Sequence, residues 1–428
     1  MSRKVLMVSW LFPPHTSIGA KRAYRFARWL PTYGWNPTVL CRRQAPASSR
    51  DPSPWPLPPE VSVRAEYDAA VFTRWSKQAS TVTAHVRHEH IKRPLRARLV
   101  ERWNLLVDAA LPLETEAIHA PHAAARIDEL APSHDLLWTT SYPYHSHWLG
   151  VRAARRHRKP IVVDLRDPWT PNWVHQRKFA HARAVEAWME RSVFEAADAI
   201  VVTTWALEEL YRERFPRVAH KFVTIHNAFD PMESAPPKRA TDGPVRLVHF
   251  GNVYGPWSFE TLLRAMAALR LEGALSPRPM VLENYGKLSD RDRALSIDLG
   301  VDDLVRVMPT VPFAEGMERM RSADLLVLAA WSDPDARLYV QGKLFDYLAA
   351  GRPIVAETAY YDVTRILAET RAGEVVAPGD VAAMTAALRR ALSPAANRYE
   401  ARAELRAPFS SPEATRRLAA LFDGLVKP

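Results

Sequence analysis

The sequence holds a single cysteine, Cys41, so no disulfide can form within the chain. No apolar stretch approaches the ~20 residues that a helix needs to cross a bilayer. The first 15 residues contain a short apolar run, but Pro13 and Pro14 interrupt it and no small-residue cleavage site follows. These absences exclude a cystine framework and a membrane-spanning protein, and we expect a cytoplasmic one.

What the sequence does contain indicates a globular protein. It has 428 residues, 47% of them hydrophobic and 25% charged, which is long enough for two domains with cores of their own. The net charge of +11 is concentrated in the first 240 residues, where 35 Lys and Arg face 23 Asp and Glu. Such an excess serves either solubility or an anionic partner such as a phosphate group or a lipid surface. No nucleic-acid motif appears, so we expect no nucleic acid.

Apolar strand-like segments alternate with helical ones along the whole chain. In the first half, strands are expected at 5–9, 38–41, 136–139, 161–164, 199–203 and 222–225, with a helix over 19–33 that ends at Gly34. In the second half, strands are expected at 245–250, 280–282, 305–308, 325–329, 353–356 and 374–377, with Ser258, Ser289 and Asp380 as helix N-caps. This alternation predicts an α/β fold of two Rossmann-like domains with parallel sheets.

The polar, proline-containing stretch at 233–243 is the best candidate for a linker. We therefore expect an N-terminal domain over 1–232 and a C-terminal domain over 244–408. The remaining segment, 409–428, has Ser411 before Pro412 and Glu413, which favours the start of a helix that could pack back on the N-terminal domain.

The most informative segment is QGKLFDYLAAGRPIVA, residues 341–356, which follows an apolar strand. Gly342 would open a helix whose N-terminus favours an anion, and Lys343 in the first turn would be disfavoured there unless an anion were bound. Asp346 lies three residues further, on the same side of the helix, where its carboxylate could accept hydrogen bonds from ribose hydroxyls. The alternative is a surface Lys–Asp pair on an ordinary helix.

Most of the chain resembles the retaining glycosyltransferases of family 4. The resemblance rests on four segments in the expected order, each at a strand end: FPPHTSIGAKRAYRFARWL, VDLRDPW, HFGNVYG and RSADLLVLAA with GKLFDYLAAGRPIVA. It implies the GT-B fold, in which two Rossmann-like domains face each other across a cleft. It also implies transfer of a sugar from a nucleotide-sugar to a hydroxyl acceptor with retention of configuration (EC 2.4), as in polysaccharide biosynthesis. The C-terminal domain would bind the donor and the N-terminal domain the acceptor, a glycan, a lipid-linked or a small molecule, without metal or cofactor.

The resemblance assigns roles in the donor site. Asp346 matches the second acid of the family's paired-acid motif and would hold the ribose, whereas the first acid, eight residues earlier, is replaced by Leu338. The loop that begins Gly251-Asn252 would bind the diphosphate, but it lacks the family's Arg and Lys. Lys343, and Lys287 after Gly286, are expected to substitute for them.

Two further groups of residues are expected in the N-terminal domain. Gly19 begins a helix with Lys21 and Arg22 in its first turn, which predicts contact with a donor phosphate or an anionic acceptor, or else solvent-facing charges. Arg166 and Asp167 directly follow a strand, where Arg166 would stabilise the leaving phosphate and Asp167 orient the acceptor hydroxyl. The alternative is a pair that only shapes its loop.

Three other patterns have weaker implications. Asp333-Pro-Asp335 and the histidines of 85–90 are poor metal sites, because neither has the ligand number that Mg²⁺ or Zn²⁺ requires. The basic stretch 87–106 could form a helix that touches a membrane surface or packs on the N-terminal core. Two functions remain as alternatives to sugar transfer: an epimerase or hydrolase on the same fold, and a non-catalytic nucleotide-sugar-binding protein.

Overall fold

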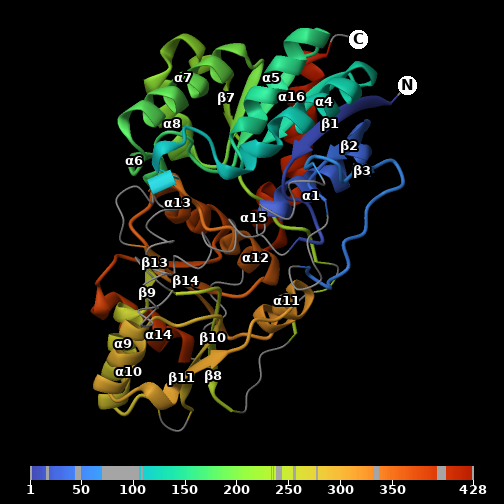
Figure 1. Ribbon diagram of the computed structural model, residues 1–428. Helices are drawn as coiled ribbons and strands as arrows, with labels where there is room; N and C mark the ends of the chain where they lie inside the picture. Colours follow the sequence, from blue (N-terminus) through green and yellow to red (C-terminus); the bar gives the residue numbers. More distant parts are fainter. Residues whose placement is uncertain are drawn as a thin grey trace. The chain divides into compact units, whose positions relative to one another are not determined.

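The computed structural model describes residues 2–15, 19–43, 50–69, 106–107, 109–232, 234, 236–237, 243–253, 257–275, 278–331, 337–392 and 402–426. The chain divides into two compact units (Figure 1). Unit 1 comprises residues 1–227 and 411–428, and unit 2 comprises 228–410.

Unit 1 is built on a sheet of seven parallel strands in the order β3-β2-β1-β4-β5-β6-β7. The strands are β1 (Arg3–Ser9), β2 (Trp35–Leu40), β3 (Ser62–Arg64), β4 (Leu136–Thr140), β5 (Ile161–Leu165), β6 (Ala199–Val202) and β7 (Phe222–Thr224). β4, β5 and β6 are buried along their whole length, as strands covered on both faces must be.

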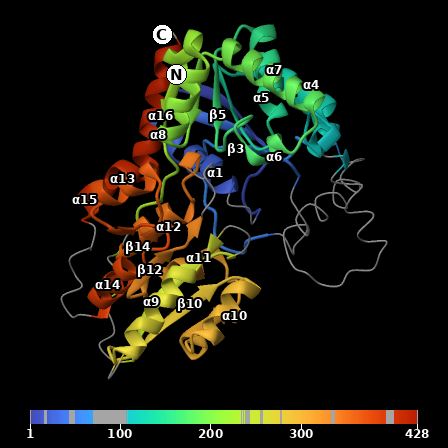
Figure 2. The same cartoon turned by 90° about the vertical axis from the view of Figure 1, so that its left-hand side faces the viewer.

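Helices cover both faces of this sheet. They are α1 (Gly19–Trp29), α4 (Ala120–Leu130), α5 (His145–His157), α6 (Trp173–Gln176), α7 (Ala180–Ala196), α8 (Trp205–Arg214) and α16 (Ser411–Leu425), with 3₁₀ turns η1 (Leu30–Tyr33), η3 (Thr115–His119), η4 (Ala131–Ser133) and η5 (Pro216–Lys221). α16, red in Figure 2, lies on one side of the strands, while α4 and α5 lie on the other. Helix α16 packs on α1, and the ring of Phe422 meets that of Trp35 edge to face with their centroids 5.2 Å apart. The end of the chain thus belongs to the core of unit 1.

Unit 2 repeats the pattern with six parallel strands in the order β11-β10-β8-β12-β14-β15. The strands are β8 (Val245–Phe250), β10 (Met280–Tyr285), β11 (Val305–Met308), β12 (Leu325–Leu328), β14 (Ile354–Glu357) and β15 (Gly373–Val376). A separate antiparallel ribbon joins β9 (Trp257–Ser258) to β13 (Ala330–Trp331).

The core of unit 2 lies between this sheet and its helices, with α9 and α14 packed together. The helices are α9 (Glu260–Leu271), α10 (Asp290–Asp298), α11 (Phe313–Arg321), α12 (Lys343–Ala350), α13 (Tyr361–Thr370), α14 (Val381–Leu392) and α15 (Ala403–Arg406), with 3₁₀ turns η6 (Asp302–Leu304) and η9 (Ala407–Phe409). Two parallel sheets with helices confirm the predicted α/β class.

The local expectations are mostly confirmed. Gly34 adopts the left-handed cap, and the side chains of Ser289 and Asp380 accept from the backbone N–H groups of Asp292 and Ala383. The expectation for Ser258 is wrong: it lies in β9, and α9 follows Phe259 without a side-chain cap. Its hydroxyl accepts from the Glu260 N–H at 3.0 Å and donates to Asp292 at 2.7 Å, so the serine connects the start of α9 to α10.

Several sequence predictions lie outside the described residues. These are Asp333 and Asp335, the histidines of 85–90, nearly all of the basic stretch 87–106 and most of the linker 233–243. No helix within the part of the chain that the structure describes is both long enough and apolar enough to span a bilayer.

Candidate active site

The sequence motif at 341–356 forms helix α12 and leads into β14, as predicted. The helix begins after Gly342, and the Leu344 and Phe345 N–H groups close its first turn on the carbonyls of Gln341 and Gly342. Tyr347 fixes this helix on the sheet, because its hydroxyl accepts from the Phe250 N–H at 3.0 Å and donates to the Val327 carbonyl at 3.2 Å. α12 is therefore attached directly to the ends of β8 and β12.

Lys343 points from α12 toward the end of β8. Its Nζ lies 2.9 Å from Nε2 of His249, a fully buried residue of that strand. Burial lowers the pKa of Lys343 to about 7. His249 in turn lies 2.7 Å, through Nδ1, from Oδ1 of Asn284 on β10. The site thus places a half-buried amine next to a neutral polar group.

The loops after β8 and β10 are hydrogen-bonded to each other next to this amine. Asn252 Oδ1 accepts from the Lys287 N–H at 2.9 Å, and the Gly251 N–H donates to the Tyr285 carbonyl at 2.9 Å. Gly286 has a φ of +143° and lies so close to Gly251 that a Cβ at 286 would be 2.6 Å from the Gly251 carbonyl oxygen. A Cβ on Gly251 would itself be 3.0 Å from Lys343 Nζ. Four of the predicted donor residues, Gly251, Asn252, Gly286 and Lys343, thus lie close together. The Lys287 side chain is exposed.

Asp346 and Leu338 differ in what they contribute. Asp346 lies one turn along α12 from Lys343, is only 6% exposed, and adds to burial in raising the pKa of Tyr347. Leu338, which stands where relatives carry the first acid, is 4% exposed and belongs to the apolar interior. Position 338 therefore offers a buried apolar side chain where relatives carry a carboxylate.

In unit 1, Arg166 and Asp167 follow β5, as predicted, and Arg166 meets Gly19. The Arg166 backbone N–H donates to Ser141 Oγ at 3.2 Å, and its Nε donates to the Ser141 carbonyl. A Cβ on Gly19 would lie 1.9 Å from an Arg166 guanidinium nitrogen, so the guanidinium lies directly against the start of α1. Burial lowers the pKa of Arg166 and raises that of Asp167, and each charge opposes the shift of the other.

Arg22 has a different environment from its predicted one. Its guanidinium forms a buried ion pair with Asp164, with a shortest distance of 2.6 Å, and also donates to the carbonyls of Ile225 and His226 at 2.9 Å. Thr140 donates to the same carboxylate at 2.8 Å. These bonds occupy the guanidinium within unit 1, so the geometry favours a role in holding β5 and the chain after β7 over the predicted phosphate contact. Lys21, the residue before Arg22 in α1, is half-buried.

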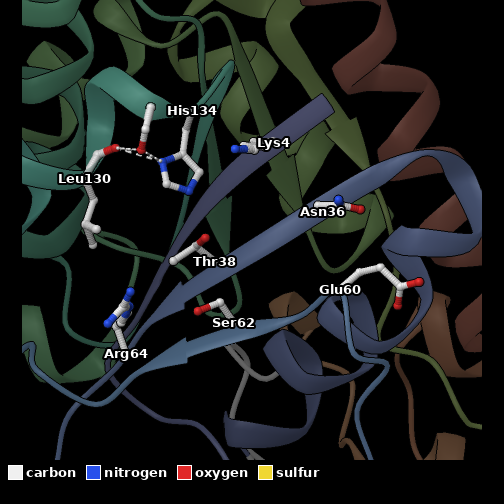
Figure 3. Close-up of a pocket in the computed structure, with 9 residues that line it drawn as sticks. Lys4, Asn36, Thr38, Glu60, Ser62, Arg64, Leu130 and His134 are labelled. Atoms are coloured by element: carbon white, nitrogen blue, oxygen red, sulfur yellow. Dashed lines mark hydrogen bonds between the residues drawn. The ribbon is translucent and has the colours of Figure 1, made fainter. Parts of the chain in front are cut away.

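One hollow of unit 1 lies apart from all of these residues. It has a volume of about 260 Å³ beside the edge strands of the sheet (Figure 3). Its lining consists of Lys4, Asn36, Thr38, Glu60, Ser62, Arg64, Leu130, Ser133 and His134. The side chains of Lys4 and Arg64 are exposed, and no predicted site residue contributes to it. Within the described ranges, no group of three or more His, Cys, Asp or Glu is arranged to hold a metal ion.

Sequence reasoning missed three residues of this arrangement. His249 and Tyr347 lay in quoted motifs without a role, while Asn284 lay outside every motif. The signal that could have found His249 and Asn284 is their position at the carboxyl ends of neighbouring strands, where polar side chains are seldom needed by the core.

Several solved structures have a fold similar to that of this chain. Sucrose-phosphate synthase from Thermosynechococcus elongatus is similar with a TM-score of 0.60 and 17% identity, covering 99% of each chain. Anabaena Alr3699/HepE in complex with UDP gives a TM-score of 0.62 and 14% identity over 99% of this chain and 100% of that one. WaaG, a glycosyltransferase involved in lipopolysaccharide biosynthesis, gives 0.55 and 16% over 98% and 96%.

Family models match both halves of the chain. Residues 19–228 match the glycosyl transferase 4-like domain, and residues 244–394 match the glycosyl transferases group 1. The chain therefore belongs to the family-4-like glycosyltransferases of the GT-B fold and is a transferase of class EC 2.4. A search of curated protein sequences finds no match to it.

Proposed function

We propose that this enzyme transfers a sugar from a nucleotide-sugar donor, bound by unit 2, to a hydroxyl acceptor, with retention of configuration and without a metal. The observation that carries the proposal is Lys343. Its amine is half-buried at the start of a helix against Gly251, and among the described residues it contacts no carboxylate. A cation that has no carboxylate partner within the described ranges, next to two glycine-containing loops that are hydrogen-bonded to each other, suits a diphosphate. HepE, which has the same fold, has been solved with UDP and with UDP-glucose.

In this proposal each predicted residue except Arg22, which is bound to Asp164, has a role. Lys343, Gly342, Gly251, Asn252, Gly286 and Lys287 would surround the diphosphate, and Asp346 would accept hydrogen bonds from the ribose. The bond between the anomeric carbon and the diphosphate breaks, and the phosphate oxygen keeps the electron pair. The acceptor hydroxyl attacks from the same face and its proton passes to the departing phosphate. Arg166 would stabilise that phosphate, Asp167 would orient the acceptor hydroxyl, and Gly19 and Lys21 would lie near an anionic part of either substrate.

Incubation with a panel of nucleotide-sugars tests this function. We expect release of nucleoside diphosphate that depends on an added glycan, lipid-linked or small hydroxyl acceptor, without added metal and unaffected by EDTA. Turnover of the donor without any acceptor would indicate the epimerase or hydrolase instead. Saturable donor binding with no turnover against the whole panel would indicate a binding protein.

We further propose that the enzyme acts at the cytoplasmic face of a membrane, with unit 1 in contact with anionic lipid. The excess of basic residues in the first 240 residues supports this, as does Trp188 on α7, whose 59% exposure is unusual for a tryptophan. We expect the enzyme to sediment with vesicles containing phosphatidylglycerol at low salt and Trp188→Ala to sediment less. Equal recovery in the supernatant with and without vesicles would refute the contact.

A further inference from the structure

A chain of three hydrogen bonds connects Lys343 to the loop after β10. Lys343 Nζ lies 2.9 Å from His249 Nε2, His249 Nδ1 lies 2.7 Å from Asn284 Oδ1, and Asn284 Nδ2 lies 2.9 Å from the Gly286 carbonyl oxygen. His249 and Asn284 are both fully buried, and they face each other in the register of β8 and β10. The chain therefore runs from the candidate phosphate-binding amine across two strands to the neighbouring loop.

The donor and acceptor of each hydrogen bond can be assigned by starting from the Gly286 carbonyl oxygen. The Gly286 carbonyl can only accept, so the Asn284 amide nitrogen must face it, and the amide oxygen must face His249. That oxygen also only accepts, so His249 carries its hydrogen on Nδ1. A neutral imidazole has one N–H, which leaves Nε2 as an acceptor for Lys343. In each of the three hydrogen bonds the donor is thus the group nearer to Lys343.

The imidazole stays neutral in this place. Burial holds the pKa of His249 well below its ordinary value and the Lys343 charge lowers it further, while the hydrogen bond that His249 donates to Asn284 acts in the opposite direction. Among the residues that the structure describes, the groups that face the imidazole are Lys343 from α12, Asn284 from β10 and the ring of Phe259, which lies edge-on with centroids 5.0 Å apart. No carboxylate is among these groups.

A neutral acceptor can fix the conformation of Lys343 without neutralising its charge, which a carboxylate could not do. A lysine side chain has several rotatable bonds, and fixing it in one conformation costs about 1.5–2 kcal/mol of entropy that one hydrogen bond can offset. A carboxylate partner would also fix it, but would neutralise the charge that a diphosphate needs. The His249 lone pair directs one ammonium hydrogen inward and leaves the positive charge and two N–H donors over Gly251.

We propose that His249 is a positioning residue for sugar transfer: as the Nδ1–H tautomer fixed by Asn284, it accepts from Lys343 and holds that amine over Gly251 for the donor diphosphate. This inference rests on the proposed donor site and adds to it how the cation is placed. His249 itself does not contact the diphosphate; it acts through Lys343.

Two substitutions of His249 separate the two ring nitrogens. Asparagine reaches only the Nδ1 position, so His249→Asn keeps the bond to Asn284 and loses the acceptor for Lys343. Glutamine reaches the Nε2 position with a carbonyl oxygen, so His249→Gln restores that acceptor. The probe is whichever of UDP, GDP, ADP, CDP and dTDP binds the wild type most tightly, together with its parent nucleoside, measured by isothermal titration calorimetry.

We expect His249→Asn to weaken diphosphate binding by about 10-fold, as loss of one well-placed charged group does, and to leave nucleoside binding unchanged. We expect His249→Gln to stay within about threefold of the wild type. Unchanged diphosphate binding in His249→Asn, combined with a loss in Lys343→Ala, would overturn the positioning role and leave the donor site standing. An equal loss of nucleoside binding would show a structural role only, and no diphosphate binding by the wild type would overturn both proposals.

Discussion

Lys343→Ala is expected to weaken binding of the preferred nucleoside diphosphate by about 50-fold, because it removes a charge-assisted contact worth roughly 2–2.5 kcal/mol. The effect should be large because the amine is half-buried and, within the described residues, is hydrogen-bonded to the neutral His249 and paired with no carboxylate. Arg293→Ala, which removes an exposed cation from α10 of the same unit, is the matched control and should change the dissociation constant by less than about twofold. Equal binding by Lys343→Ala and Arg293→Ala would remove the amine from the donor site.

The same residue predicts how binding depends on pH. Burial brings the pKa of Lys343 to about 7, so the free site loses its charge as the pH rises through neutrality. A diphosphate prefers the protonated amine and so raises its pKa, which means that affinity is highest below the free pKa and falls above it, by up to about tenfold per pH unit. Lys343→Arg keeps its charge throughout this range, so its affinity should not fall above pH 7. Calorimetric titrations of the two proteins from about pH 6.5 to about pH 8.5 compare them, and parallel profiles would contradict the assignment.

Asp164→Ala is expected to destabilise unit 1 by about 4 kcal/mol, since it leaves the buried Arg22 guanidinium without its counter-ion. Both side chains are at most 4% exposed, and Arg22 also holds the carbonyls of Ile225 and His226 after β7. Replacing one partner should therefore lower the free energy of unfolding by more than replacing both does. The double variant Arg22→Met/Asp164→Leu should accordingly recover part of the stability lost in Asp164→Ala.

Hydrogen exchange followed by mass spectrometry measures this effect in each unit separately, which matters because two units need not unfold together. Peptides from β5 and α1 should lose protection in Asp164→Ala, while peptides from β8 and β10 of unit 2 serve as the internal control. Unchanged protection of β5 and α1 would show that the ion pair does not stabilise unit 1.

The sequence predicted those features of the fold that depend on local pattern. Buried strands such as β5 appear as short apolar runs, and Gly34 and Ser289 end or begin helices through their own conformations and side chains. The edge strand β3 escaped prediction because all three of its residues are exposed and show no apolar run. Ser258 was assigned the wrong role because its partner, Asp292, lies 34 residues away.

The sequence predicted which residues belong to the candidate site, but not which side chains they are hydrogen-bonded to. Gly342, Lys343 and Asp346 could be placed because a helix fixes their spacing. The bond between His249 and Asn284 depends on the register of two parallel strands 35 residues apart, which periodicity does not determine. For the same reason Arg22 was expected to meet a phosphate, whereas Asp164, 142 residues away, occupies it.

The most direct test is a crystal structure of the enzyme with its preferred nucleoside diphosphate. It should place the diphosphate within hydrogen-bond distance of Lys343 Nζ and beside Gly251 and Asn252, with the ribose hydroxyls at Asp346. A nucleotide bound with its diphosphate away from the start of α12 would contradict the donor site described here.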